Sequence, residues 1–184
     1  WAFGEVRDAY DDRDAILYAL GIGLPISAGE SDDLNFLVED RLRVLPSFAV
    51  TLASPGMWPK LPALAVDWVR VLHMAHACRF VAPLPAAAEV VSRARVTAIF
   101  DRGADKGSVC YLERSVTDAH SGTLYAVITQ TVAMRGDGGF GGAPLPKAAR
   151  PVMPDHAPDH RESVTSSARA AYIYRLSGDS NPLH

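Results

Sequence analysis

The chain has 184 residues, enough for one large domain or for one domain and part of another, but too few for two complete large domains. Its hydrophobic content of 48 % with 21 % charged residues is typical of a globular protein and excludes a disordered or fibrous chain. A net charge of −3 without a basic stripe argues against nucleic acid, and no apolar run reaches the roughly 18 residues that cross a bilayer, so we expect a cytoplasmic protein without membrane contact.

The first predicted element is a short amphipathic helix over residues 10–20. Asp11 and Asp12 are candidates for its N-cap, and Gly21 is the expected stop. Its apolar face is predicted to carry Ile16, Leu17 and Leu20. The stretch 24–68 is rich in proline and glycine with brief apolar runs, which predicts turns with short elements.

Residues 70–135 predict an antiparallel sheet. Apolar and polar residues alternate in "EVVSRARVTAIF" and in "TLYAVITQTVAMR", which is the period of a half-buried strand. Between them lies "SVCYLERSV", flanked by the turn-rich segments "DRGADKG" and "TDAHSG", and "VRVLHMAHACRFVAPL" adds another strand that ends at Pro83. A sheet with one apolar face needs a helical cover, so we expect an α+β fold in which the N-terminal helix covers the sheet.

After Met134 the chain becomes rich in glycine and proline, which indicates a linker or a functional loop. Helical signals return in "TSSARAAYIYRLSGD", with Ser166 or Ser167 as the cap and Gly178 as the stop. A shift of 156 residues aligns "ILYALGIG" with "YIYRLSGD", as though a second domain opened with the same helix as the first.

A carboxylate, an amide and an imidazole follow Gly178 within six residues. Asp179 and His184 form a workable acid–base pair, because histidine titrates near neutrality and a carboxylate fixes its tautomer, and Asn181 lies between them. The alternative is a turn in which Asp179 caps, Asn181 forms an Asx turn and His184 is solvated. Spacing alone favours this alternative.

The run "YRLSGDSNPLH" resembles the signature of the hydratase 2 family, the (R)-specific 2-enoyl-CoA hydratases of the MaoC-like group. The similarity extends to "RDAILYALGIG", "LPSFAV", "PLP" at 83–85 and the glycine-rich "RGDGGFGG". It implies a double hot-dog architecture, in which antiparallel sheets wrap around helices. Residues 1–150 would then form the N-terminal hot dog with its glycine-rich loop 136–142, residues 151–162 a linker, and residues 163–184 the truncated start of the catalytic hot dog.

The resemblance also implies roles for individual residues. Asp179 and His184 would activate water for syn addition to a trans-2-enoyl-CoA, and Asn181 would position water or substrate. The substrate or CoA contacts would be His73, Met74, Arg102, Lys106, Phe140, Gly141, Ser177 and Gly178. Met74 replaces a glycine of the family pattern, and either Arg102 or Lys106 could face the CoA phosphates. The alternatives are a surface histidine, solvated turn charges and a plain flexible loop.

We expect neither a cofactor nor a metal, and acyl-CoA is the expected substrate. "GDGGFG" matches the dinucleotide pattern formally, but the prolines after it prevent the helix that would bind pyrophosphate. His156 and His160 lie in a proline-rich linker without rigid ligand geometry, and Cys78 and Cys110 are predicted to be buried free thiols.

Three kinds of function therefore remain open. The first is a hydratase, and the second is a non-catalytic acyl-CoA-binding hot-dog subunit that pairs with a separate catalytic chain. The third is an assembly module without a ligand. The presence of Asp179, Asn181 and His184 favours the hydratase, whereas a native chain that ended at His184 would favour the second. Exposed sheet edges lead us to expect a homodimer.

Overall fold

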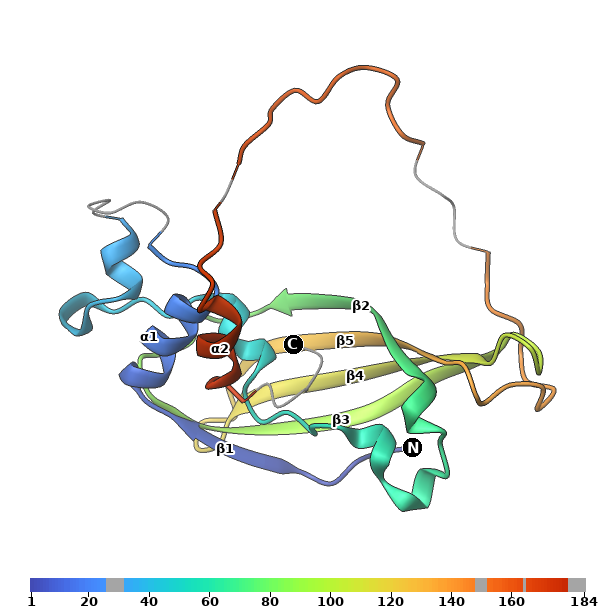
Figure 1. Ribbon diagram of the computed structural model, residues 1–184. Helices are drawn as coiled ribbons and strands as arrows, with labels where there is room; N and C mark the ends of the chain where they lie inside the picture. The colour runs from blue at the N-terminus through green and yellow to red at the C-terminus, as the bar shows by residue number, and fades with distance from the viewer. Residues whose placement is uncertain (26–31, 148–151, 164, 179–184) are drawn as a thin grey trace.

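The computed structural model describes residues 1–25, 32–147, 152–163 and 165–178. One antiparallel sheet of five strands dominates it, in the order β1-β3-β4-β5-β2 (Figure 1). The strands are β1 (Val6–Tyr10), β2 (Val71–Phe80), β3 (Ala88–Asp101), β4 (Ser108–Asp118) and β5 (Leu124–Met134). The predicted meander of consecutive strands is confirmed, and so is the additional strand before it.

Strand β1 was not predicted from the sequence. Among the described strands it pairs with β3 alone, from Val6 opposite Ser92 to Tyr10 opposite Ala88, and the three residues in its middle are exposed. An edge strand of five residues with an exposed centre has no alternating apolar pattern, so its pairing partner rather than its own sequence defines it.

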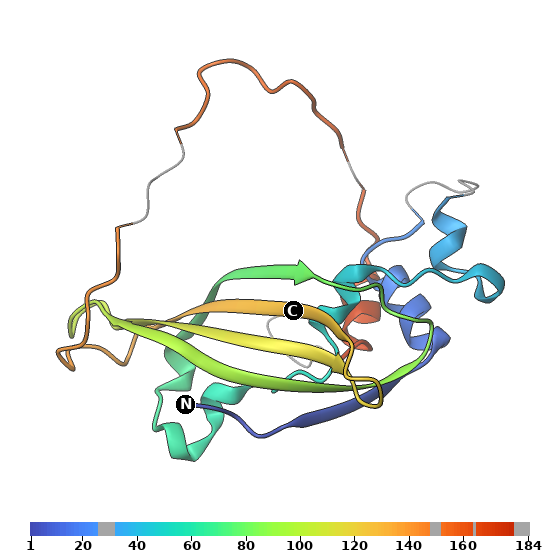
Figure 2. The same cartoon turned by 180° about the vertical axis from the view of Figure 1, so that it is seen from behind.

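Helices α1 (Asp12–Gly21) and α2 (Ala170–Arg175) lie side by side on one face of the sheet, and the light-blue segment after α1 extends past the end of the sheet (Figures 1 and 2). The described residues also contain the short 3-10 helices η1 (Asp33–Phe36), η2 (Glu39–Arg41), η3 (Pro46–Val50), η4 (Trp58–Lys60), η5 (Pro62–Leu64) and η6 (Trp68–Arg70). The expectation of turns with short elements between residues 24 and 68 is confirmed for the described part of that stretch. Within the described ranges, no helix is long and apolar enough to cross a membrane.

Helix α1 begins as predicted but buries a different face. The Asp11 side chain accepts a hydrogen bond from the Asp14 backbone N–H at 3.2 Å, and the Asp14 side chain accepts one from the Asp11 N–H at 3.2 Å. The buried residues are Ala15, Tyr18, Ala19 and Gly21, whereas Leu20 is exposed. The prediction that Leu20 faces the core was therefore wrong. Small residues on the buried face let the helix backbone approach its neighbours closely, and Tyr18 fills the space against Phe48, with 5.1 Å between ring centroids.

The covered face of the sheet holds two hydrophobic clusters. One lies under α1 and η3 and includes Tyr18, Phe48 and Ile128, and the other surrounds Trp58 and includes Leu112. Cys110 is buried in the second cluster, and Cys78 is only half-buried at the border of the first; both are free thiols. The burial predicted for Cys78 is therefore only partial, because β2 is an edge strand.

A buried arginine joins the sheet to the segment that crosses it. Arg114 on β4 is 3 % exposed, and its guanidinium donates hydrogen bonds to the carbonyl oxygens of Val50, at 2.7 Å, and Leu52. The adjoining residue Ala53 donates its N–H to Asp8 at 2.9 Å and accepts a hydrogen bond from Ser92 at 2.5 Å. Burial lowers the pKa of Arg114 to about 10, so the side chain stays charged at neutral pH. The end of η3 is therefore held by side chains from three strands.

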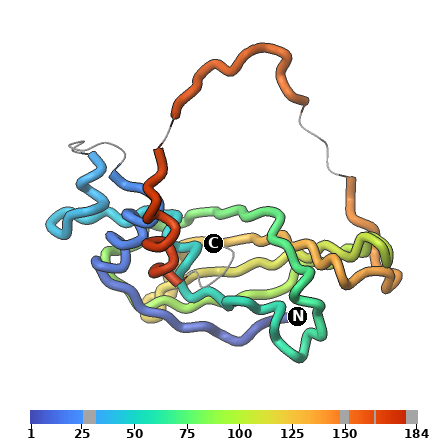
Figure 3. Tube along the Cα trace, viewed as in Figure 1, coloured from blue at the N-terminus to red at the C-terminus, as the bar shows by residue number. Residues whose placement is uncertain are grey.

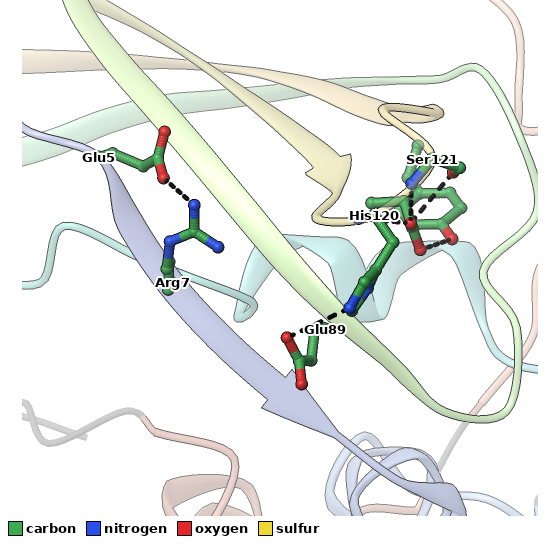
Figure 4. A network of polar contacts seen from close by, with 7 residues as sticks. Glu5, Arg7, Glu89, His120 and Ser121 are labelled. Carbon is green, nitrogen blue, oxygen red and sulfur yellow. Dashed lines mark hydrogen bonds and ion pairs between the residues drawn. The ribbon is translucent and has the colours of Figure 1, made fainter.

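The turn between β4 and β5 is organised by Asp118. Its carboxylate accepts hydrogen bonds from the backbone N–H groups of Ser121 and His120, at 2.7 and 3.0 Å, and from the hydroxyl of Tyr125 at 2.9 Å. The N–H of Ser121, the Tyr125 hydroxyl and the N–H of His120 lower the pKa of Asp118 to about 2. Figure 4 shows this turn beside Glu89, which lies 3.9 Å from the His120 imidazole. The turn predicted at "TDAHSG" is confirmed.

Helix α2 packs against α1, although the two are far apart in sequence (Figures 1 and 3). The rings of Tyr18 and Tyr174, which the internal alignment pairs, lie 6.0 Å apart between centroids. A Cβ at Gly21 would lie 2.9 Å from the Tyr174 Cα, so only glycine permits this approach. The helix is shorter than predicted. Its N-cap is Arg169 and no described side chain caps it; the hydroxyl of Ser167, two residues earlier, accepts the N–H of Arg169 itself.

Replacing Arg114 with methionine is expected to lower the free energy of unfolding by about 3 kcal/mol, because two buried carbonyls lose their donors. The matched control is Arg95→Met on the open face, where an exposed pair with Glu113 contributes less than about 1 kcal/mol. Urea unfolding of both variants checks the prediction. Equal losses would show that the buried guanidinium has no special role.

The substitution Gly21→Ala is expected to push α2 away from α1, because its Cβ would meet the backbone of Tyr174. Amide hydrogen exchange in α2 should then accelerate about tenfold while β4 stays protected. Gly4→Ala, where nothing lies within 4 Å of the added methyl, is the control. Unchanged exchange in α2 would contradict the close packing of the two helices.

Candidate functional site

The predicted catalytic residues Asp179, Asn181 and His184 lie outside the described residues. The structure does describe the segment that leads to them. Ser177 has a buried hydroxyl that makes no hydrogen bond to any described residue. Gly178 has φ +98°, a left-handed conformation that ends a helix and that glycine adopts without strain. The helix ends earlier than predicted, at Arg175, and Gly178 lies in the turn that follows it, immediately before the predicted acid–base residues.

Six of the expected substrate contacts lie toward one end of the sheet. The register pairs Val71 at the start of β2 with Met134 at the end of β5, and Met134 with Ser108 at the start of β4. Ser108 in turn pairs with Asp101 at the end of β3. This end carries His73, Met74, Arg102, Lys106, Phe140 and Gly141. Ser177 and Gly178 follow α2, which packs on α1 beside the other end, so the structure does not bring all predicted contacts together.

His73 and Met74 lie at an irregularity in β2. The register with β5 shifts between His73 and Ala75, which leaves Met74 as the extra residue, and it is 54 % exposed. The shift places His73 beside His76, with 5.4 Å between ring centroids. The Nε2 atom of His76 is buried without a hydrogen bond to any described residue. Burial, then His73, then Arg114 lower the pKa of His76, so this imidazole is neutral at neutral pH.

Arg102 and Lys106 occupy the turn between β3 and β4. Both side chains are exposed, and neither forms an ion pair with another described residue. The turn itself is closed by hydrogen bonds from the Arg102 N–H to the Gly107 carbonyl, at 2.9 Å, and from the Lys106 N–H to the Gly103 carbonyl, at 3.1 Å. Two free cations on a short turn can bind an anionic group, and the structure leaves both available for that role.

The glycine-rich loop 136–142 lies next to this turn and is hydrogen-bonded at both ends. Asp137 accepts the Asp67 N–H at 3.2 Å, and Asp101 accepts the N–H groups of Gly139, Gly141 and Gly142. The Phe140 ring lies against Gly142 of the same loop, and 57 % of the Phe140 surface is exposed. These hydrogen bonds attach the loop to the end of β3 and to the residues before η6.

Three residues of interest were not singled out from the sequence: Asp101 and Arg114, which hold segments together, and His76, which lies beside His73. An aspartate two residues before a glycine at the end of a strand signals an Asx turn, which accounts for its contact with Gly103 only. Its contacts with residues about forty positions away give no local signal. His76 could have been paired with His73 only if the irregularity at Met74 had been known.

Comparison with known proteins identifies the family. Residues 9–136 match the family described as MFE-2 hydratase 2 N-terminal domain. The 3-hydroxyacyl-thioester dehydratase Y of Mycobacterium tuberculosis is 38 % identical over 95 % of this chain and 60 % of its own length. The peroxisomal enoyl-CoA hydratase 2 of Arabidopsis thaliana is 32 % identical over 98 % of this chain and 63 % of its own length.

The structural comparison agrees with the sequence comparison. The crystal structure of a MaoC-like dehydratase from Phytophthora capsici superposes with a TM-score of 0.76 and 26 % identity, over 98 % of this chain and 63 % of that one. The predicted α+β hot-dog fold is thereby confirmed. The chain spans less than two thirds of the length of each of these three proteins. It belongs to the MaoC-like hydratase 2 family, in which it corresponds to the N-terminal domain and the residues that follow it.

Proposed function

We propose that the protein carrying this chain is an (R)-specific 2-enoyl-CoA hydratase, which also catalyses the reverse dehydration of 3-hydroxyacyl-CoA. The observation that carries the proposal is the alignment of 95 % and 98 % of the chain with a dehydratase and an enoyl-CoA hydratase. These relatives are longer than the chain, so the activity is proposed for the complete protein. The run from Tyr174 to His184, which resembles the family signature, supports it.

In the proposed mechanism, Asp179 and His184 hold one water molecule and remove its proton as the oxygen attacks C3 of the enoyl thioester. A proton is delivered to C2 on the same face, so the double bond becomes a C–O and a C–H bond by syn addition. Asn181 orients the water or the substrate. The negative charge that develops on the thioester oxygen requires hydrogen-bond donors such as the N-terminus of a helix, and no described residue matches that part of the family pattern.

The CoA thioester is proposed to bind along the sheet. Its phosphates would meet Arg102 or Lys106, which are exposed and unpaired among the described residues, and Phe140 would contact the apolar part of the substrate. His73, Met74 and Gly141 lie at the same end of the sheet, whereas Ser177 and Gly178 belong to the segment of Asp179. An elongated substrate with an anionic head suits the separation of the cationic turn from Ser177 and Gly178. The proposed reaction needs no cofactor and no metal.

The proposal includes a homodimer in the cytoplasm. Two features of β2 support self-association. It lies at the edge of the sheet, where its backbone groups could pair with another chain, and its side chains Leu72 and Met74 are exposed and apolar. The name of the Arabidopsis relative places that protein in the peroxisome, so the location of the complete protein has to be determined by imaging in cells.

The substitution Asp179→Asn is expected to reduce kcat for crotonyl-CoA hydration at least about 100-fold, because an amide cannot accept the proton of water. Loss of the conjugated enoyl absorbance measures the rate in the complete protein. Asp155→Asn, an exposed carboxylate in the linker, is the matched control and should leave the rate unchanged. Equal rates for the Asp179 variant and the unaltered protein would rule out the dyad.

A further inference from the structure

The carboxylate of Asp101 is surrounded by backbone donors from two separate loops. Its Oδ1 atom accepts the N–H groups of Gly103 and Gly139, both at 2.8 Å, and its Oδ2 atom accepts those of Gly141, at 2.7 Å, and Gly142, at 3.3 Å. Gly103 belongs to the cationic turn that carries Arg102 and Lys106, and the other three belong to the glycine-rich loop. One side chain therefore bonds both segments.

The two segments also mesh through their backbones. A Cβ at Gly138 would lie 2.5 Å from the carbonyl oxygens of Gly103 and Gly107, so no side chain fits between loop and turn. A Cβ at Gly139 would lie 3.0 Å from the methyl group of Ala104. The Asp101 N–H donates to the Ala143 carbonyl at 2.9 Å, which continues the attachment past the end of the loop. Turn and loop consequently form one unit, and the side chains of Arg102, Lys106 and Phe140 are exposed on it.

This arrangement decides what the glycine-rich loop can bind. Successive backbone N–H groups in a glycine-rich loop ordinarily form a concave site for a phosphate. Here the N–H groups of Gly139, Gly141 and Gly142 point to Asp101, and they are already occupied by an anion of the protein itself. The N–H groups of Gly139 and Gly103 lower the pKa of the Asp101 carboxyl, so it is ionised at neutral pH. These three N–H groups are therefore not available to a phosphate of a ligand, and the cationic side chains of Arg102 and Lys106 are the groups of this unit that could bind one.

We propose that Asp101 is a positioning residue for the CoA thioester: it locks the glycine-rich loop onto the cationic turn, and so fixes where Arg102, Lys106 and Phe140 meet the substrate. The inference rests on the proposed function for the identity of the ligand. It goes beyond that function by assigning a role to a residue that carries the wrong charge for phosphate binding. Asp101 acts through the two loops and does not touch the ligand.

The sign of one substitution separates positioning from simple electrostatics. Asp101→Asn removes a negative charge near the cationic turn, and electrostatics alone would strengthen phosphate binding. Positioning predicts the opposite, because the amide NH₂ faces N–H donors and the loop is released. Asp105→Asn is the matched control, since it removes the same charge from the same turn without contact to the glycine-rich loop.

The expected result in the complete protein is that Asp101→Asn raises KM for crotonyl-CoA about fivefold and changes kcat less than about twofold. KM for crotonyl-pantetheine, which lacks the nucleotide phosphates but keeps the apolar part that Phe140 would contact, should rise less than KM for crotonyl-CoA. A general loss of folded protein would instead lower kcat for both substrates and leave both KM values unchanged. Asp105→Asn should leave KM for crotonyl-CoA unchanged or lower it. Equal KM values for the two variants would overturn the positioning role.

Amide hydrogen exchange tests the contact between Asp101 and the loop without substrate, and so independently of the proposed hydratase activity. The amides of Gly139, Gly141 and Gly142 should exchange faster in Asp101→Asn than in Asp105→Asn, with no substrate present. Unchanged exchange would show that Asp101 does not hold the loop. An unaltered protein that fails to hydrate crotonyl-CoA would contradict the hydratase proposal, and the exchange of these three amides would still decide whether Asp101 locks the loop.

Discussion

The fold depends on one buried charge. Arg114 lies on the covered face of β4, where its guanidinium binds the carbonyl oxygens of Val50 and Leu52 and no described carboxylate compensates it. A charge of this kind is costly to bury unless each donor finds an acceptor, so the position of η3 and the turn after it is narrowly defined. Phe48 of η3 packs on Tyr18 of α1, and Tyr18 packs on Tyr174 of α2. The hydrogen bonds of Arg114 therefore also help to place α2, the helix that precedes Asp179 in the chain.

The two ends of the sheet carry different contacts. At one end a carboxylate, Asp101, holds a glycine-rich loop and a cationic turn together, and at the other end α1 receives α2. The proposed substrate is elongated, with its phosphates at one end and its reactive thioester far from them. The length of the antiparallel sheet suits a substrate of this shape. Gly21 and Gly138 serve the same purpose at the two ends, since each allows a backbone approach that a Cβ would prevent.

Local signals in the sequence predicted the parts of the fold that depend on local physics. Alternation identified β3 and β5, the flanking turns identified β4 between them, and Asp11 was one of the two predicted caps of α1. The prediction of the buried face of α1 was wrong because it followed the large apolar residues. The buried face instead carries the small residues Ala15 and Ala19, which allow close packing. The role of Asp101 could not be predicted, because its partners lie about forty residues away, and the roles assigned to Asp179, Asn181 and His184 came from resemblance.

The central claim is that the complete protein adds water to a 2-enoyl-CoA with (R) stereochemistry by syn addition. The most direct measurement is hydration of crotonyl-CoA in deuterium oxide, followed by determination of both new stereocentres in the 3-hydroxybutyryl-CoA product. We predict the 3R alcohol with deuterium at C2 on the face that receives the oxygen. A 3S product, or deuterium on the opposite face, would contradict the proposed reaction.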